Sequence, residues 1–196
     1  WKSWNSKFGN KSDHIAHVNG IVDNNIIANK FAKHFEQVCT PFSATRDAQL
    51  KAKYEEKRLN YCGCPVSEAD KFDVELLSNL VCNMKNGKAA SLDELTSEHL
   101  KFSHPIIIVI LCKLFNLFVS TSHIPSSFGA SYSVPIPKCD VRCKGLTVDD
   151  FRCISISTVI SKLFELALLD RFGSYLETSD NQFGFKKHLG CRDVIF

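Results

Sequence analysis

The feature that most constrains the fold is a strand, loop, strand and helix pattern between residues 132 and 172. A short apolar segment, residues 132–137, ends on Lys138, and a polar loop returns the chain through a second apolar segment at residues 151–156. Apolar runs of this length, bounded by polar residues, predict two strands. Ser157 then offers an N-cap for a helix that follows at once. The apolar residues of this helix recur at helical spacing: Val159, Ile160, Leu163, Phe164, Ala167, Leu168 and Phe172.

The first third of the chain predicts one amphipathic helix and a charged connection. Asp23 is the predicted N-cap, and Pro41 ends the helix. Residues 43–66 are rich in charged side chains, which predicts a solvated helix or linker. The apolar stripe of the first helix consists of Ile27, Phe31, Phe35 and Val38.

Two further helices are predicted in the middle of the chain. Asp73 is the N-cap of a helix whose apolar residues recur until Gly87, which offers a C-terminal cap. Residues 105–119 are the most apolar run, but Lys113 and Asn116 interrupt it. A membrane span needs about 18–20 uninterrupted apolar residues. The run therefore predicts a buried helix of a chain that does not enter a membrane.

Composition supports a globular protein, with 44% hydrophobic and 23% charged residues. A net charge of +3 is too small to argue for nucleic-acid binding by itself. The nine cysteines lack the paired C-x-x-C spacing of a zinc site, and the first residues do not resemble a signal peptide. We therefore expect reduced thiols and an intracellular protein, nuclear or cytoplasmic and not secreted. The less favoured alternative is a metal site formed by Cys62, Cys64, Cys139 and Cys143.

Four short blocks follow one another in the second half of the chain: Ile136-Pro-Lys138, Phe151-Arg-Cys-Ile-Ser155, Ser161-Lys-Leu-Phe-Glu165 and Gln182-Phe-Gly-Phe-Lys186. In this order the sequence resembles the first blocks of the reverse transcriptases of LINE-type, jockey-like non-LTR retrotransposons. Any single block would be a weak signal. Residues 18–35 also resemble the segment that precedes the polymerase in these elements, and Glu98-His-Leu-Lys101 matches the family pattern.

The resemblance implies an α+β fold that is mostly helical, with a small antiparallel sheet, corresponding to the fingers and the start of the palm of a right-hand reverse transcriptase. Residues 1–66 would be the region preceding the polymerase, and residues 67–196 the amino-terminal part of the reverse transcriptase. Lys138 and Arg152 would bind the triphosphate of the incoming deoxynucleotide, the lysine as a point charge and the arginine through bidentate contacts. The residues implied to bind an RNA template and a DNA primer are Lys85, Lys88, Phe185, Lys186, Lys187 and Arg192.

The two aspartate motifs that hold Mg²⁺ in the palm of this family do not occur in the sequence. They would follow Phe196, so we expect an amino-terminal fragment without polymerase activity, metal or small-molecule cofactor, whose intact parent uses Mg²⁺ for nucleotidyl transfer. The chain departs from the family pattern at Cys153, where proline is usual, and at Ala90 and Ser91, where Pro-Gly is usual. These departures favour the alternative of a non-enzymatic helical interaction protein. A non-functional product of a decayed element is a further alternative.

Overall fold

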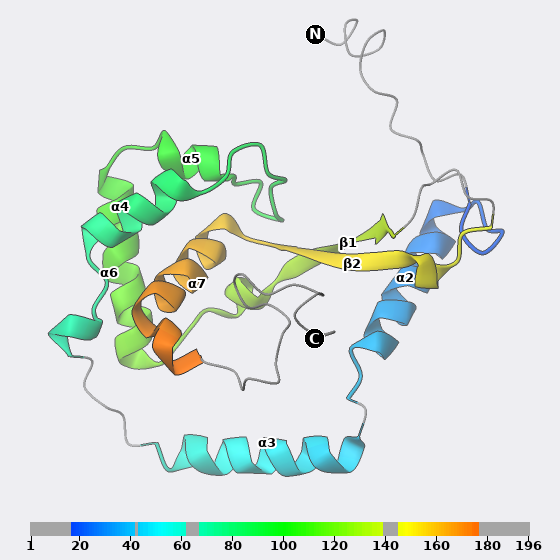
Figure 1. The fold of residues 1–196 in the computed structure, drawn as a ribbon, viewed down its shortest axis with the longest axis horizontal. Coiled ribbons are helices and arrows are strands. Elements are labelled where there is room, and N and C mark those ends of the chain that lie inside the picture. Colours follow the sequence, from blue (N-terminus) through cyan, green and yellow to red (C-terminus); the bar gives the residue numbers. More distant parts are fainter. Residues whose placement is uncertain (1–16, 42, 62–66, 139–144, 177–196) are drawn as a thin grey trace, which may run out of the picture. The chain divides into compact units, whose positions relative to one another are not determined.

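The computed structural model describes most of the chain, and the described residues form an α+β fold that is mostly helical, as expected (Figure 1). They group into two compact units. Of the described residues, the first unit combines 17–41, 43–61, 132–138 and 145–156, and the second combines 67–131 and 157–176. The sequence-based division between residues 66 and 67 concerns the parts of a parent polymerase and stays a prediction. The described residues are 17–41, 43–61, 67–138 and 145–176.

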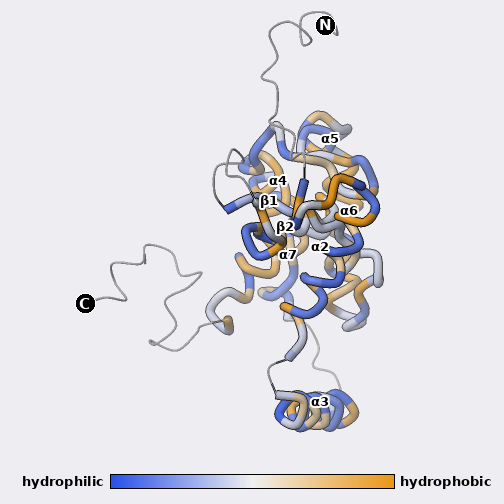
Figure 2. The backbone as a smooth tube through the Cα atoms, turned by 90° about the vertical axis from the view of Figure 1, so that its right-hand side faces the viewer, coloured by the Kyte–Doolittle hydropathy of each residue, from blue (hydrophilic) through white to orange (hydrophobic). Residues whose placement is uncertain are grey.

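The first unit contains helix α2 (Asn24–Val38), helix α3 (Ala44–Leu59) and a sheet of two strands, β1 (Ser131–Pro137) and β2 (Phe151–Ser157). Asp23 caps α2 as predicted, because its carboxylate accepts two N–H groups of the first turn, both at 2.9 Å. Figure 2 shows hydrophilic and hydrophobic residues mixed along α3, and none of its residues is buried. The prediction of a solvated helix in this charged region is therefore confirmed.

A tight turn precedes α2 and anchors the core of the first unit. Val18 and Ile21 exchange both of their backbone hydrogen bonds, at 3.0 and 2.9 Å. The two residues between them, Asn19 and Gly20, have φ angles of 52° and 74°. Asparagine and glycine tolerate this left-handed conformation, which is why Asn-Gly is preferred in two-residue turns. The turn buries Val18 in a small apolar cluster with Phe31, Leu146 and Phe151.

The second unit is a bundle of helices. Its helix α6 (Ile106–Thr121) confirms the buried helix predicted from the apolar run, since four of its side chains are buried. None of the helices in the described ranges is both long enough and apolar enough to cross a membrane. The other elements of this unit are α4 (Val74–Asn83), α5 (Ser97–Lys101), α7 (Val159–Phe172) and the 3-10 turns η1 (Glu68–Asp70), η2 (Ser126–Gly129) and η4 (Gly173–Leu176).

Aromatic rings form the centre of the second unit. Phe164 of α7 is only 3% exposed, and four other phenylalanine rings surround it. The centroid of its ring lies 4.9 Å from that of Phe115, 5.7 Å from Phe118, 6.0 Å from Phe128 and 6.2 Å from Phe72. The last three contacts are edge-to-face, the arrangement that the quadrupoles of aromatic rings favour.

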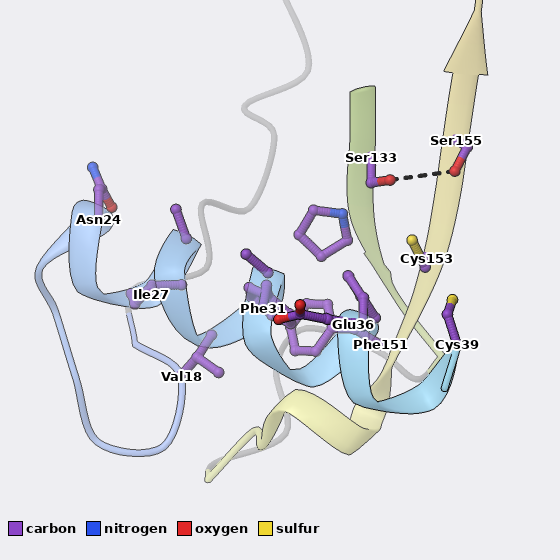
Figure 3. A pocket seen from close by; sticks show the side chains of 14 residues that line it. Val18, Asn24, Ile27, Phe31, Glu36, Cys39, Ser133, Phe151, Cys153 and Ser155 are labelled. Atoms are coloured by element: carbon purple, nitrogen blue, oxygen red, sulfur yellow. Dashed lines mark hydrogen bonds between the residues drawn. The ribbon is translucent and has the colours of Figure 1, made fainter. Parts of the chain in front are cut away.

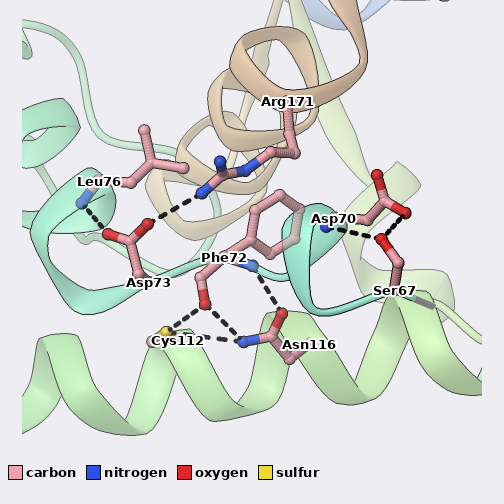
Figure 4. Close-up of polar contacts among 8 residues, drawn as sticks. All are labelled: Ser67, Asp70, Phe72, Asp73, Leu76, Cys112, Asn116 and Arg171. Carbon is pink, nitrogen blue, oxygen red and sulfur yellow. Dashed lines mark hydrogen bonds and ion pairs between the residues drawn. The ribbon is translucent and has the colours of Figure 1, made fainter.

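A polar residue inside the apolar run attaches the chain before α4 to α6 (Figure 4). The Asn116 side chain accepts the backbone N–H of Phe72 and donates to its carbonyl, both at 2.8 Å. The Cys112 thiol also donates to this carbonyl, at 3.2 Å, and burial raises the pKa of the thiol. Asn116 therefore satisfies both backbone groups of a segment that belongs to no helix or strand.

Asp73 joins α4 to α7 at the same place (Figure 4). One carboxylate oxygen accepts the N–H of Leu76 at 2.7 Å, which caps α4 as predicted, and the other accepts from Arg171 at 2.9 Å. The Leu76 N–H and then the Arg171 guanidinium hold the pKa of Asp73 below its usual value. These contacts therefore stabilise the fold above the unfolded-state pKa and are lost as the pH falls through the folded-state pKa.

Three details of the predicted elements are wrong. Helix α7 is capped by Thr158 instead of Ser157, because the Thr158 hydroxyl accepts an N–H of the first turn at 3.2 Å while Ser157 is still in β2. Helix α4 ends at Asn83 and does not continue to Gly87, whose backbone is held by α5. Val38, the last residue of α2, lies outside the cluster that covers the rest of the apolar stripe and is 67% exposed.

Replacement of Phe164 by alanine should destabilise the second unit. The change removes a ring from the middle of the aromatic core, and such a cavity costs about 3–5 kcal/mol in the free energy of unfolding. Urea denaturation followed by circular dichroism measures this loss. Leu169→Ala, at a 54% exposed position on the same helix, is the matched control and should cost less than about 1 kcal/mol. Equal losses from the two variants would show that the aromatic cluster is not the centre of this core.

Candidate functional site

The register of the hairpin determines where its charged residues lie. The backbone N–H of Lys138 donates to the carbonyl of Asp150 at 2.7 Å, and the hydroxyls of Ser133 and Ser155 are 3.2 Å apart. Both contacts fit one antiparallel register, in which Arg152 is the diagonal neighbour of Lys138. Diagonal neighbours point to the same face of a sheet. The structure thus brings the two predicted nucleotide-binding residues together on one face, while their role stays a prediction.

Both cations are exposed, and their surroundings leave donors free. The Lys138 ammonium donates to the carbonyl of Asp149 at 2.6 Å, which uses one of its three donors. Among the described residues, no ion pair or hydrogen bond of the Arg152 guanidinium is found. An anion that reached this face could therefore accept hydrogen bonds from both side chains.

The acidic pair before β2 is engaged in the turn that leads into the strand. The Asp150 carboxylate accepts the N–H and the hydroxyl of Thr147, at 2.8 and 2.9 Å, in the 3-10 turn η3 (Val148–Asp150). These two bonds, and to a lesser extent the charge of Lys138, hold the pKa of Asp150 below its usual value. The side chain of Asp149 is 80% exposed. Asp150 is therefore a turn cap, and Asp149 is a surface charge.

Helix α2 packs against the start of β2. The ring of Phe31 meets that of Phe151 edge to face, with centroids 4.8 Å apart, and both rings are buried. The imidazole Nε2 of His34 lies 3.7 Å from a carboxylate oxygen of Asp149. This helix therefore holds the end of the hairpin that presents the two cations.

The Asn-Gly turn before α2 also binds the segment that leads into β2. The N–H of Asn19 donates to the carbonyl of Leu146 at 2.8 Å, and its side-chain oxygen accepts the N–H of Val148 at 3.2 Å. Sequence reasoning missed this contact. An Asn-Gly pair signals a turn, but no local pattern signals a partner 129 positions away.

A groove of about 750 Å³ lies between α2 and the face of the hairpin that is turned away from Lys138 and Arg152 (Figure 3). Strand alternation separates the two faces, because residues 133, 135, 151, 153 and 155 line the groove and the even-numbered residues point the other way. Sequence reasoning did not predict this groove. Its lining also includes Val18, Asn24, Ile27, Ala28, Phe31, Ala32, Phe35, Glu36 and Cys39.

The predicted nucleic-acid-binding residues Lys85 and Lys88 lie exposed on a turn after α4. Helix α5 holds this turn through three side chains. The Ser97 hydroxyl donates to the carbonyl of Lys85 at 2.8 Å, the Glu98 carboxylate accepts the N–H of Gly87 at 2.5 Å, and the Lys101 ammonium donates to the carbonyl of Met84 at 2.5 Å. Helix α5 thus fixes the backbone of the turn that carries the two exposed lysines.

The remaining predicted residues, Phe185, Lys186, Lys187 and Arg192, lie outside the described residues, as does the block Gln182-Phe-Gly-Phe-Lys186 that contains two of them. The structure therefore does not test them. The cysteines of the alternative metal site also fall outside the described ranges. Within those ranges, no group of three or more potential metal-binding side chains occurs.

Comparison with models of known protein families gives no match, and comparison with curated proteins gives no significant match. A function for the chain must therefore be argued from its own residues.

The hydrogen bonds that hold the turn after α4 can be tested through Glu98. Its hydrogen bond from the Gly87 N–H, with smaller contributions from its own N–H and from Thr96, lowers the pKa of Glu98 from 4.5 to about 2. These bonds therefore stabilise the folded chain above a pH of about 4.5 and are lost as the pH falls through about 2. Carboxyl-detected NMR titration should give the low value. Glu98→Gln should speed hydrogen exchange of the Gly87 amide, and an ordinary pKa for Glu98 would contradict these hydrogen bonds.

Proposed function

We propose that the chain is part of the reverse transcriptase of a LINE-type, jockey-like non-LTR retrotransposon, and that the end of its hairpin binds the triphosphate of an incoming deoxynucleotide. The observation that carries the proposal is the position of Lys138 and Arg152, which share one exposed face at the same end of a two-stranded sheet. The four ordered sequence blocks support it, since both residues belong to these blocks.

The chemistry of the two cations suits this ligand. A nucleoside triphosphate carries several negative charges, and a guanidinium can bind two phosphate oxygens at once while an ammonium acts as a point charge. Neither Lys138 nor Arg152 forms an ion pair with a carboxylate in the described part of the chain, although the charge of Lys138 contributes to the lowered pKa of Asp150. The bond of Lys138 to the Asp149 carbonyl fixes the direction of the lysine and leaves its charge available.

A template and a primer are the proposed partners of the basic residues. Lys85 and Lys88 would contact the phosphates of the RNA template or the DNA primer, because their turn is held rigid by α5 and both side chains point into solvent. Phe185, Lys186, Lys187 and Arg192 complete the proposed nucleic-acid surface, with the aromatic ring available for stacking.

Mg²⁺ would belong to the intact parent polymerase. A two-metal site needs several carboxylates around one point. The described residues do not fit this requirement, because no group of three potential ligands occurs among them and Asp150 is already bonded to Thr147. No step of nucleotide transfer is therefore assigned to this chain.

The alternative from a different class is a non-enzymatic interaction protein that keeps the fold of a decayed element. It predicts the same hairpin but no affinity for triphosphate. Binding of nucleotide to the 196-residue chain separates the two proposals.

Replacement of Arg152 by alanine should weaken nucleotide binding. Loss of a charge-assisted contact costs about 1.5–3 kcal/mol, so the dissociation constant should rise about 10- to 150-fold. The rise should be similar for all four deoxynucleotides, because a phosphate contact carries no information about the base. Calorimetric titration at low salt measures it.

Arg58→Ala on α3 is the control for that experiment, because Arg58 is also exposed and its guanidinium forms an ion pair with Glu55 on the same helix. It should leave nucleotide binding unchanged. If Arg152→Ala left the affinity unchanged in a folded protein, or if no deoxynucleotide bound at all, the interaction-protein alternative would be preferred.

The 196-residue protein should not extend a primer with Mg²⁺ or Mn²⁺. Its sequence lacks the paired aspartates that position the metal ions and the attacking hydroxyl. A primer-extension assay with an RNA template measures this, with a complete reverse transcriptase as the positive control. Extension above background would require a carboxylate site that the sequence patterns do not reveal.

A further inference from the structure

The hairpin has two strands, so each of them has an outer edge in the described part of the chain (Figure 1). The N–H of Lys138 donates to the carbonyl of Asp150, which makes these two residues a hydrogen-bonded pair of the antiparallel ladder. Alternate residues of such a ladder bond to the partner strand, and the residues between them turn their backbone groups outward. The odd-numbered residues of β1 and β2 therefore form the two outer edges.

The outer edge of β1 is protected against a further strand. Its outward residues include Pro135 and Pro137, which have no N–H to donate. Proline on an edge strand is one of the ways in which proteins prevent strand addition. A new strand would therefore find too few donors along β1.

The outer edge of β2 lacks this protection. Its sequence contains no proline, and its outward residues Cys153 and Ser155 are exposed. The N–H of Phe151 is bonded to the carbonyl of Val148. By contrast, the backbone N–H and carbonyl groups of Cys153 and Ser155 have no partner among the described residues. Two donors and two acceptors thus lie along one open edge.

These four groups are self-complementary about a two-fold axis at Ile154. When two β2 strands lie antiparallel with their Ile154 residues opposite each other, Cys153 of each copy faces Ser155 of the other. Each of these two pairs can exchange two hydrogen bonds, so every free group of both residues is satisfied. A register centred on Cys153 would instead need the N–H of Phe151, which is already bonded.

The side chains on the even-numbered face also fit this register. Ile154 is 42% exposed, and it would meet Ile154 of the second copy at a non-hydrogen-bonded position, where opposite side chains are closest. Arg152 would lie opposite Ile156 of the second copy. The two arginines are therefore not placed directly opposite each other, which would be unfavourable.

Pairing of the two hairpins would also produce a closed assembly. A sheet of two strands is only marginally stable, whereas a sheet of three or more strands with an apolar face can be stable. The joined sheet has the strand order β1, β2, β2, β1, and both of its edges contain Pro135 and Pro137. The only unprotected edge of the described hairpin is consumed by one copy, so the assembly stops at a dimer.

We propose that β2 is a dimerisation edge, through which two copies of this chain join their hairpins into one antiparallel four-stranded sheet. Lys138 and Arg152 remain on one face of this sheet. The proposal rests on the open edge and on its self-complementary register, and it does not depend on nucleotide binding.

Replacement of Cys153 by proline tests the edge. The change removes an N–H that points away from β1, so the ladder within the hairpin is kept. Two of the four bonds between the copies are lost, and the dissociation constant of the dimer should rise about tenfold or more. Sedimentation velocity of the full chain in reductant measures it. Cys153→Ala keeps the N–H and should leave the constant unchanged.

Two outcomes of this experiment would overturn the proposal. One is an equal rise of the dissociation constant in Cys153→Pro and Cys153→Ala. The other is an unsubstituted chain that stays monomeric up to about 1 mM.

A pair of matched substitutions tests the register. Ile154→Lys places two ammonium groups opposite each other at the two-fold axis and should weaken the dimer about tenfold or more at low salt. Ile136→Lys adds the same charge to the same face, at a position of β1 that is 44% exposed, and should leave the dimer unchanged. Circular dichroism verifies that both variants are folded. Equal weakening by two folded variants would contradict pairing through β2.

Hydrogen exchange measures the edge without any substitution. The amides of Cys153 and Ser155 should exchange about tenfold or more slowly above the dissociation constant of the dimer than below it. The amide of Ser133, on the outer edge of β1, should exchange at the same rate at both concentrations. Fast exchange of the β2 amides at every concentration would overturn the proposal. Slow exchange that does not depend on concentration would also overturn it, in favour of a segment of the same chain on this edge.

Discussion

The packing of Phe31 on Phe151 is the interaction on which the candidate site depends. A hairpin of two strands is only marginally stable in water, so β1 and β2 need a partner on at least one face. Helix α2 provides it through buried rings whose centroids are 4.8 Å apart. Because one face of the hairpin is taken by this helix, Lys138 and Arg152 remain accessible on the other. A segment near the beginning of the chain thus determines the geometry of residues more than a hundred positions later.

In the second unit, polar residues within apolar sequence fix the course of the chain. Asn116 interrupts the most apolar run of the chain, and its amide satisfies both backbone groups of Phe72. A leucine at this position would add apolar surface to the core but would leave the buried N–H of Phe72 without a partner, which costs about 1–3 kcal/mol, and would leave its carbonyl with only the weak thiol donor of Cys112. The aromatic core around Phe164 fixes the spacing of the helices, while Asn116 and Asp73 fix where the chain enters α4.

The elements were predictable where the signal was local, and the contacts between them were not. Asp23 and Asp73 cap helices as predicted, since a cap needs only a short side chain and the next few N–H groups. The end of α4 was predicted wrongly, because the bonds that α5 makes to the turn before Gly87 depend on tertiary structure. The hydrogen bonds of Asn19 with Leu146 and Val148 could not be predicted from the periodicity or spacing of the sequence. Lys138 and Arg152 could be placed on one hairpin from the sequence, but the groove behind them could not.

The departures from the reverse transcriptase pattern leave Lys138 and Arg152 themselves unchanged. Cys153 replaces a proline on β2, and it lines the groove on the opposite face from Arg152. A cysteine has the backbone N–H that a proline lacks, so the change does not weaken the strand. Ala90 and Ser91 replace Pro-Gly in a connection that remains ordered, where Ser91 is 7% exposed and its carbonyl accepts the N–H of Glu94 at 3.0 Å. Neither change removes a donor from Lys138 or Arg152. The replacements therefore do not argue against anion binding at the hairpin, and the choice between a polymerase segment and an interaction protein depends on the cation face itself.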